Sequence, residues 1–219
     1  MKRISLNGNI FLAILSILLL VSCSKDEGEK HGTLVYEENF NEDSKWFVGT
    51  DNLLRSEINN GKYILNYSIN GTYVNGFNCP VNIFEQGKKQ ILEISFKQPG
   101  GKGDAGIIFD RRDSDNKSWI VIEQSGHFTI FNHEDGELVI IQNWEESSAI
   151  QPIDKTNILR LENENGNIEF FINNTNIYSW KNSGITTLDR IGLGAANYNS
   201  NNSQTTVIEY DYVKAWSQE

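Results

Sequence analysis

The chain has 219 residues, and its 29 acidic residues outnumber 19 basic ones, which gives a formal net charge of −10. This excess of negative charge disfavours nucleic acid as a partner, because a basic patch supplies most of the affinity for a phosphate backbone. It also disfavours electrostatic docking on anionic lipid. The length is sufficient for one β-sandwich with a sizeable core, and the sequence shows neither an internal repeat nor a second globular domain.

Residues 1–22 are predicted to be a secretory signal peptide. Two basic residues precede an apolar run, Ile10–Val21, whose length of about 12 residues falls short of the roughly 20 that a membrane-spanning helix needs. The run ends in Leu20-Val21-Ser22-Cys23, which resembles the lipobox of bacterial lipoproteins. The resemblance implies cleavage before Cys23 and a lipid anchor on that residue. The alternative is an ordinary signal peptide with a chance cysteine.

Residues 23–32 are expected to form a lipidated, acidic linker. Ser24, and not Asp, stands at the second position after cleavage, which resembles the sorting rule for the outer membrane. Lys25-Asp26-Glu27, followed by Glu29, resembles an export tag that some Gram-negative lineages use to display lipoproteins on the cell surface. We therefore expect a lipid-anchored protein of the outer membrane, exposed at the cell surface. A plain solvated linker is the alternative.

Residues 33–219 are predicted to be one all-β domain. Beyond the linker, no segment shows sustained helical periodicity, and the only helix-like piece is Trp144–Ala149. Dipeptides that supply the positive φ angles of tight hairpins separate the β-rich runs. They are Asn60-Gly61, Asn70-Gly71, Ser125-Gly126, Asp135-Gly136 and Asn165-Gly166.

Apolar residues alternate within these runs, which identifies the side chains expected in the core. These sets are Tyr63/Leu65/Tyr67, Leu92/Ile94/Phe96, Leu159/Leu161 and Ile168/Phe170/Ile172. In the last run the alternation changes phase between Tyr210 and Val213, so we expect a β-bulge near Asp211-Tyr212. Trp46 and Trp216 are expected in the core.

The stretch Asp104–Asn132 is predicted to lie at the centre of the sandwich. It holds three apolar runs separated by turn residues, which indicates three successive antiparallel strands. In the middle run, Trp119–Ile122, the alternation disappears, which is typical of a strand covered on both faces. Its second face is then either capped by loops or a concave surface with exposed aromatic residues.

Cysteine content excludes an intrachain disulfide if Cys23 is lipidated, because Cys79 then has no partner. We interpret Cys79 as a buried, inert thiol.

Several motifs follow one another along the chain in a characteristic order: Glu38-Asn39-Phe40 with Trp46, Asn60–Tyr63, Ala105–Phe109, Asp115–Trp119, Asn157–Leu161, Ile168–Asn173, Ile191–Leu193 and Tyr210–Trp216. Their order resembles the concanavalin A-like lectin/glucanase family, including laminin-G-like modules, in the small form found on bacterial surface proteins. This resemblance implies an antiparallel jelly roll over essentially residues 33–217. The family includes lectins and glycosidases, so the resemblance alone does not assign a function.

Retaining glycosidases of this fold resemble one another in a strand that carries Glu-x-Asp-x-Glu or Glu-x-Asp-x-x-Glu. Two of its carboxylates, about 5–5.5 Å apart, act as nucleophile and acid/base. The nearest match is Glu209–Lys214, in which Val213 and Lys214 occupy both places of the second Glu. We interpret Glu209 and Asp211 as structural and expect no catalytic residue.

Other polar residues form no recognisable site. Asp110, Glu123 and Glu169 could face a groove but make no evident pair, and the three histidines lack metal-ligand spacing. The cluster Asp110/Asp113/Asp115/Asn116 lacks the Gly and terminal Glu of an EF-hand loop, so a polar hairpin is the preferred interpretation. We expect no cofactor; structural calcium, with Asp211 as a conceivable ligand, is an open alternative.

Residues suited to glycan binding do occur. Sugar sites combine aromatic faces with carboxylate, amide and guanidinium groups. Arg111, Arg112 and Trp119 lie in or beside the central strands, Trp144 is expected in a following loop, and Tyr198 in a polar loop. We predict these five as ligand-binding residues, with a core position as the alternative for both tryptophans.

The leading hypothesis is a surface-exposed outer-membrane lipoprotein with a non-catalytic lectin-like domain that binds glycan or another extracellular partner. The alternatives are a glycoside hydrolase with atypical catalytic carboxylates, and an accessory or scaffold subunit of an envelope complex. An enzyme would need two carboxyl groups that face each other across a cleft.

Overall fold

The computed structural model of the chain describes residues 31–51, 54–68, 73–100, 104–123, 125–188, 190–197 and 205–219. One compact unit runs from His31 to Glu219. The signal peptide with Cys23, the Asn70-Gly71 turn and Tyr198 lie outside the described residues, so the predictions for them stay predictions.

The described residues form strands joined by turns and loops, and none of them is helical. No helix in this part of the chain is long and apolar enough to cross a membrane. The strands are β1 (Thr33–Glu38), β2 (Gly49–Asp51), β3 (Leu54–Ile58), β4 (Tyr63–Ser68), β5 (Tyr73–Asn78), β6 (Lys89–Gly100), β7 (Asp104–Arg111), β8 (Lys117–Glu123), β9 (His127–Glu134), β10 (Glu137–Glu146), β11 (Thr156–Glu164), β12 (Asn167–Ile172), β13 (Thr175–Trp180), β14 (Gly192–Asn197) and β15 (Thr205–Gln218).

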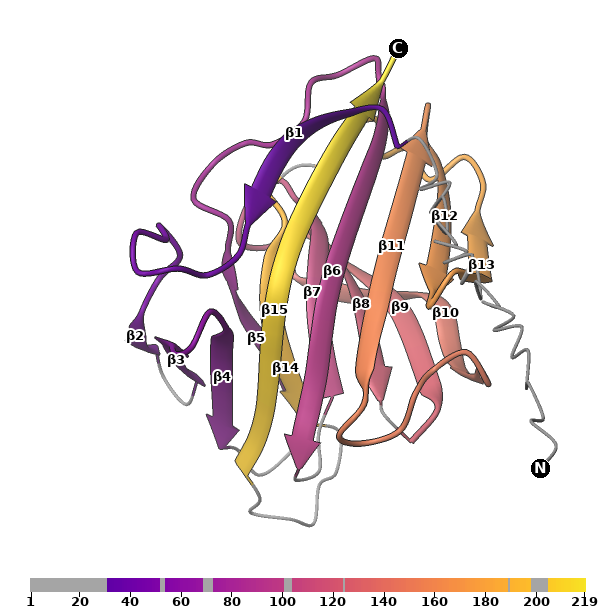
Figure 1. The fold of residues 1–219 in the computed structure, drawn as a ribbon. Helices are drawn as coiled ribbons and strands as arrows, with labels where there is room; N and C mark the ends of the chain where they lie inside the picture. The colour runs from indigo at the N-terminus through magenta and orange to yellow at the C-terminus, as the bar shows by residue number, and fades with distance from the viewer. Residues whose placement is uncertain are drawn as a thin grey trace, which may run out of the picture. The chain divides into compact units, whose positions relative to one another are not determined.

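These strands pair into two antiparallel sheets that pack face to face (Figure 1). A nine-stranded sheet has the order β13-β12-β11-β6-β15-β4-β3-β2, with β1 paired to β15. A six-stranded sheet has the order β10-β9-β8-β7-β14-β5. The prediction of an antiparallel sandwich is confirmed, and the three central runs of the sequence are the neighbouring strands β7, β8 and β9.

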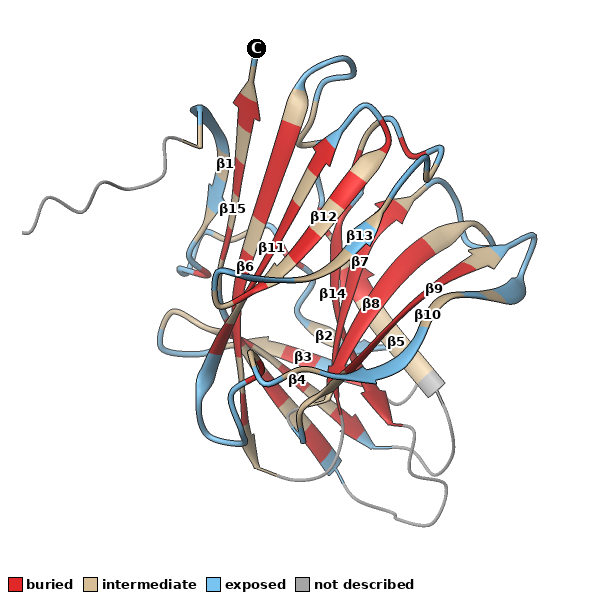
Figure 2. Cartoon of the chain, turned by 90° about the vertical axis from the view of Figure 1, so that its right-hand side faces the viewer, coloured by how far each residue is buried: buried red, intermediate tan, exposed pale blue. Residues whose placement is uncertain are grey.

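The main core lies between the sheets, and Figure 2 shows buried residues along the middle of both. All the alternating sets predicted from the sequence belong to this core, as do Trp46 and Cys79. Burial also raises the pKa of the Cys79 thiol, which keeps it protonated and unreactive at neutral pH.

Two predictions for the last strand have different outcomes. The expected bulge is present, because the register of β15 against β6 shifts between Tyr210 and Tyr212, and both Tyr210 and Val213 are fully buried. The core position expected for Trp216 is wrong. Its neighbours Ala215 and Ser217 point into the core, so Trp216 points away from it, and its ring contacts that of His31 with centroids 5.0 Å apart and planes tilted by 43°.

The hairpin predictions hold where the structure describes them. Both residues of Asn60-Gly61, Asp135-Gly136 and Asn165-Gly166 have positive φ, as does Gly126. These are the conformations that two-residue hairpin turns require, and they connect β3 to β4, β9 to β10 and β11 to β12. The helix-like piece expected at Trp144–Ala149 is not helical. β10 continues to Glu146, so Trp144 lies in an edge strand and not in a loop.

Candidate functional site

The six-stranded sheet has apolar side chains on both faces. In β8, Ile120 and Ile122 join the main core, while Trp119 and Val121 point to the opposite face. We call the face that points away from the main core the outer face. It carries a second, separate apolar cluster, against which Val74 of β5 packs. The sequence prediction that β8 is covered on both faces is confirmed. The buried members of the cluster are Ile108, Trp119, Val121, Phe131 and Ala196.

Glycines make room for the indole of Trp119 on the outer face. Gly106 of β7 and Gly194 of β14 are directly opposite each other in the sheet. A Cβ added to Gly194 would lie 3.0 Å from Cζ3 of Trp119, and one added to Gly106 would lie 3.2 Å from the same atom. On its other side Trp119 stacks on Phe131 of β9, with ring centroids 6.4 Å apart and planes inclined by 18°. The aromatic floor of the outer face therefore depends on small residues beside it.

Basic side chains form a row at one end of the outer face. Arg111 (β7), Lys117 (β8) and His133 (β9) are directly opposite one another in register, and therefore share a face. Burial, and then the charge of Arg111, lower the pKa of Lys117 despite opposing attraction from Asp115 and Asp113. Burial, and then the charge of Lys117, lower the pKa of His133. The row is therefore electrostatically strained, because like charges opposite each other destabilise a sheet.

The other end of the outer face carries acidic residues. Asp104 (β7), Glu123 (β8) and His127 (β9) are also directly opposite one another. Asp104 is 4% exposed, and burial, followed by the charge of Glu123, raises its pKa to about 8. The Glu123 side chain is 44% exposed, and one of its carboxylate oxygens lies 3.9 Å from Nδ1 of His127. This end therefore pairs a carboxyl group that holds its proton at neutral pH with a more exposed carboxyl group.

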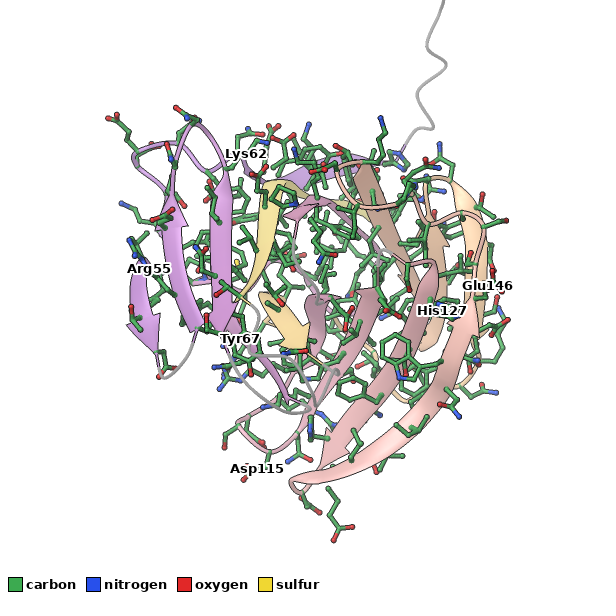
Figure 3. The ribbon with its side chains drawn as sticks, turned by 90° about the horizontal axis from the view of Figure 1, so that it is seen from below. Arg55, Lys62, Tyr67, Asp115, His127 and Glu146 are labelled. Carbon is green, nitrogen blue, oxygen red and sulfur yellow. The ribbon has the colours of Figure 1, made fainter. Side chains whose placement is uncertain are left out.

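The two ends lie on opposite sides of the aromatic floor. Lys117 and Glu123 are six positions apart on β8, a distance of about 20 Å at the usual strand rise. In Figure 3 Asp115, just before Lys117, lies at one end of these strands and His127 at the other. Both Lys117 and Glu123 have the same parity along β8 as Trp119, so all three side chains point to one face.

The edge strand β10 lines this face with exposed apolar residues. Leu138 is opposite His133 and Ile140 is opposite Phe131, and these two side chains are 58% and 50% exposed. Trp144, farther along the same strand, is 38% exposed. An edge strand with three exposed large apolar side chains is unusual for a surface that contacts only water.

Comparison with known proteins adds the fold. No protein-family model matches the chain, and no curated protein matches its sequence. Among solved structures, Bacillus licheniformis β-glucanase matches with a TM-score of 0.60 at 12% identity, over 85% of this chain and 99% of that enzyme. The κ-carrageenase of Pseudoalteromonas carrageenovora, in complex with an oligotetrasaccharide, matches with a TM-score of 0.54 at 15% identity, over 84% of this chain and 94% of that enzyme. The carbohydrate recognition domain of Emp46p matches with a TM-score of 0.54 at 13% identity, over 85% of this chain and 96% of that domain.

The domain is a concanavalin A-like jelly roll. The resemblance inferred from the sequence is therefore confirmed at the level of the fold. At 12–15% identity these similarities show the jelly-roll fold, and they do not identify a ligand of this chain.

The jelly roll separates the residues that the sequence suggested as ligand contacts. Trp119 is 2% exposed and forms the floor of the outer face, so it offers no open ring face for a ligand. Arg111 lies in the basic row on that face. Nε of Arg112 lies 3.4 Å from a carboxylate oxygen of Asp110. Because side chains alternate along a strand, Arg112 lies on the opposite side from Arg111. Trp144 is exposed on β10. Their roles in binding stay predictions.

The acidic motif of the last strand lies on the other sheet of the jelly roll. Glu209 points away from the main core, where one carboxylate oxygen accepts a hydrogen bond from Nζ of Lys62 at 2.8 Å and lies 3.7 Å from Nζ of Lys97. Glu169 is likewise held by Asn176, Ser179 and Lys181. Both carboxylates are thus committed to neighbouring side chains.

The Asp110–Asn116 segment is a hairpin turn in which an oxygen of Asp113 accepts hydrogen bonds from the backbone N–H of Asp115 and of Asn116, both at 2.8 Å. The side-chain amide of Asn116, which donates to the Asp113 carboxylate, and then these two backbone bonds lower the pKa of Asp113. The part of the chain that the structure describes contains no group of three or more His, Cys, Asp or Glu placed to hold a metal ion. That the domain needs no cofactor stays a prediction, with structural calcium as the open alternative.

Sequence reasoning missed four residues of the outer face: Asp104, Lys117, His127 and His133. Each is unremarkable in its own segment. They can be identified because they lie on the same face of the sheet as Trp119. This placement follows from side-chain alternation along each strand together with the pairing register of β7, β8 and β9.

Proposed function

We propose that the domain binds a glycan chain along the outer face of the six-stranded sheet. The observation that carries the proposal is the exposed apolar rim formed by Leu138, Ile140 and Trp144 beside ionisable groups at both ends of the same sheet. Carbohydrate sites combine apolar or aromatic surface, which covers the C–H faces of sugars, with polar groups that bind hydroxyls. The jelly-roll fold, shared with carbohydrate-binding and carbohydrate-cleaving proteins, supports the same function.

A binding measurement with a matched pair of variants tests this proposal. The protein from His31 to Glu219, which contains both sheets and the whole described core, is applied to a glycan array and to immobilised polysaccharides. Trp144→Ala should weaken binding about five- to thirtyfold, which corresponds to the loss of about 1–2 kcal/mol of aromatic contact. Ile153→Ala, which truncates a similarly exposed side chain between β10 and β11, should leave binding unchanged. Absence of binding to every glycan would overturn the proposal.

A second candidate function, hydrolysis of the bound glycan, is favoured by the pair Asp104 and Glu123. Glycosidases use two carboxyl groups whose environments differ, one protonated and one ionised. Here Asp104 would donate a proton to the departing glycosidic oxygen, and Glu123 would act as nucleophile or as base for a water molecule. The raised pKa of Asp104 and the direct pairing of the two residues support these roles.

The release of reducing ends from any bound polysaccharide tests this second function. Glu123→Gln and Asp104→Asn should each abolish the release of reducing ends without abolishing binding. Asp211→Asn, which alters an exposed residue, should retain that release. Binding with no release by the unaltered protein would leave a lectin-like domain.

We further propose that the protein is a lipoprotein of the outer membrane, exposed at the cell surface and anchored by lipid at Cys23. The lipobox-like segment and the acidic residues that follow it support this placement. Metabolic labelling with a fatty acid should mark the unaltered protein and not Cys23→Ala. Protease treatment of intact cells should then remove the domain; full protection would contradict surface exposure. A protein partner at the cell surface is the alternative to a glycan.

A further inference from the structure

In the part of the chain that the structure describes, the strand register places no acidic residue opposite the basic row, and the nearest attraction on Lys117 comes from Asp115 and Asp113 in the turn between β7 and β8. Arg111, Lys117 and His133 occupy three adjacent strands in register, in a protein whose net charge is −10. Among the described residues, the ammonium group of Lys117 makes no ion pair. Burial and the charge of Arg111 both disfavour its charged form. Within the described ranges, the side chain of Arg111 donates one hydrogen bond, from Nε to the backbone oxygen of Asp113, at 3.1 Å. The positive charge of the row is therefore incompletely balanced within the fold.

Two polar atoms on the same face lack hydrogen-bond partners. Nε1 of Trp119 and Nδ1 of His133 are buried, and neither has a partner in the described part of the chain. Trp119 is next to Lys117 along this face of β8, and His133 is opposite Lys117, with its ring edge-on to Phe131 at 5.6 Å. Buried polar groups in native proteins are nearly always paired, so an unpaired one calls for an explanation such as strain, a catalytic role or a bound water or ion. The two residues that carry these atoms are thus both neighbours of Lys117 on the outer face.

We propose that this row is a subsite for an anionic substituent, a sulfate or a carboxylate, of an acidic polysaccharide. The inference rests on the proposed glycan-binding function and specifies its ligand class. The guanidinium of Arg111 and the ammonium of Lys117 would contact the anionic oxygens, since charge-assisted hydrogen bonds of this kind are the strongest available to side chains. His133 would donate a further hydrogen bond once protonated, and the rim residues Leu138 and Ile140 would cover the adjoining sugar. The cross-strand repulsion that costs stability in the free protein would become attraction to the ligand.

Paired oligosaccharides of one backbone test the proposal. The protein from His31 to Glu219 is titrated calorimetrically with κ-carrageenan oligosaccharides, with the same oligosaccharides after chemical desulfation, and with oligogalacturonates. A sulfated or uronic oligosaccharide should bind at least about tenfold more tightly than the desulfated one, a difference of about 1.4 kcal/mol. Preference for sulfate or for carboxylate identifies the group. Raising the salt concentration should reduce this preference.

Lys117→Gln should lower the affinity for the acidic oligosaccharide about tenfold and thereby remove most of its preference over the desulfated one. Lys88→Gln, which removes the same charge from the exposed turn before β6, is the matched control and should have no effect. The imidazole titration of His133, followed by NMR, gives a second readout: the bound acidic oligosaccharide should raise its pKa, and the desulfated oligosaccharide serves as the reference.

The outcomes separate this inference from the function on which it rests. Equal binding of neutral and acidic oligosaccharides, insensitive to Lys117→Gln, would overturn the anionic subsite and leave glycan binding in place. Binding to no glycan on the array or in the titrations would overturn both.

Discussion

The hydroxyl of Tyr210 on β15 donates a hydrogen bond across the core to the backbone oxygen of Gly194 on β14, at 2.6 Å, and lies 3.1 Å from the backbone oxygen of Gly106 on β7. Tyr210 is fully buried, so this hydroxyl has no access to water. It joins the nine-stranded sheet to the two strands that carry the glycines beneath Trp119. The core and the outer face are thus connected through one side chain.

Tyr210→Phe should lower the free energy of unfolding by about 1–3 kcal/mol, because it leaves two buried carbonyl oxygens without that donor. Urea denaturation measures the loss. Tyr212→Phe is the control, since its hydroxyl donates to the Glu93 carboxylate at 2.8 Å on a partly exposed surface. An equal loss in both variants would argue against a special role for the buried bond.

Gly194→Ala should be among the most destabilising small substitutions in the domain. Its Cβ would lie 2.5 Å from the backbone oxygen of Asn75 and 3.0 Å from Trp119, so the backbone would have to shift. We expect a loss of about 1–3 kcal/mol, typical of overpacking, together with a change in tryptophan fluorescence. Gly100→Ala, where an added Cβ meets nothing within 4 Å, should be near neutral; a comparable loss there would contradict the steric explanation.

Asp104 predicts a specific dependence of stability on pH. Its folded-state pKa, about 8, lies above the ordinary value of 3.8, so the folded state binds the proton more tightly than the unfolded state does. The resulting stabilisation is complete below about pH 4 and is lost as the pH rises through about 8. Asp104→Asn cannot ionise, so at pH 9 it should exceed the unaltered protein in stability by more than about 1 kcal/mol.

Thermal unfolding of the two proteins across this range measures the effect of Asp104→Asn. The difference between them should shrink towards pH 4. A constant difference at all pH values would show that Asp104 does not titrate as the structure indicates. Asp211→Asn, which removes an exposed carboxylate, controls for the change in net charge.

Lys117→Gln should stabilise the free protein slightly, by about 0.2–1 kcal/mol, because it removes a partly buried charge that lies opposite Arg111. The gain should be larger at low salt, where the repulsion is less screened. Denaturation of this variant and of Lys88→Gln at two salt concentrations tests the point. Destabilisation by Lys117→Gln would mean that Lys117 is balanced by a partner within the fold.

The sequence was sufficient for features that depend on local periodicity. The phase change between Tyr210 and Val213 predicted the bulge in β15, and the unbroken apolar run at Trp119–Ile122 predicted a strand buried on both faces. In each case the side-chain period of two residues determines the result within a single strand. The same bulge brings Ala215 to the core side of β15, so alternation places the next residue, Trp216, on the outer side. The prediction that Trp216 lies in the core did not apply this alternation.

The candidate site could not be predicted in the same way. Asp104, Glu123 and His127 become neighbours only through the pairing register of three strands, which depends on turn lengths and on the bulge in β7 between Ile108 and Asp110. That bulge also determines which of the adjacent residues Arg111 and Arg112 lies on the outer face, because it changes the phase of the alternation before both. Tertiary pairing, and not local composition, determines which polar groups meet.

The unlike ends of the outer face have a consequence for orientation. A polysaccharide chain has chemically distinct ends, and a face with Lys117 at one side of Trp119 and Glu123 at the other is itself polar. A chain with acidic substituents would therefore lie in one direction only, with the same end towards β10's Glu146 each time. A protein fixed at its N-terminus would then present every captured chain to its surroundings with a single polarity.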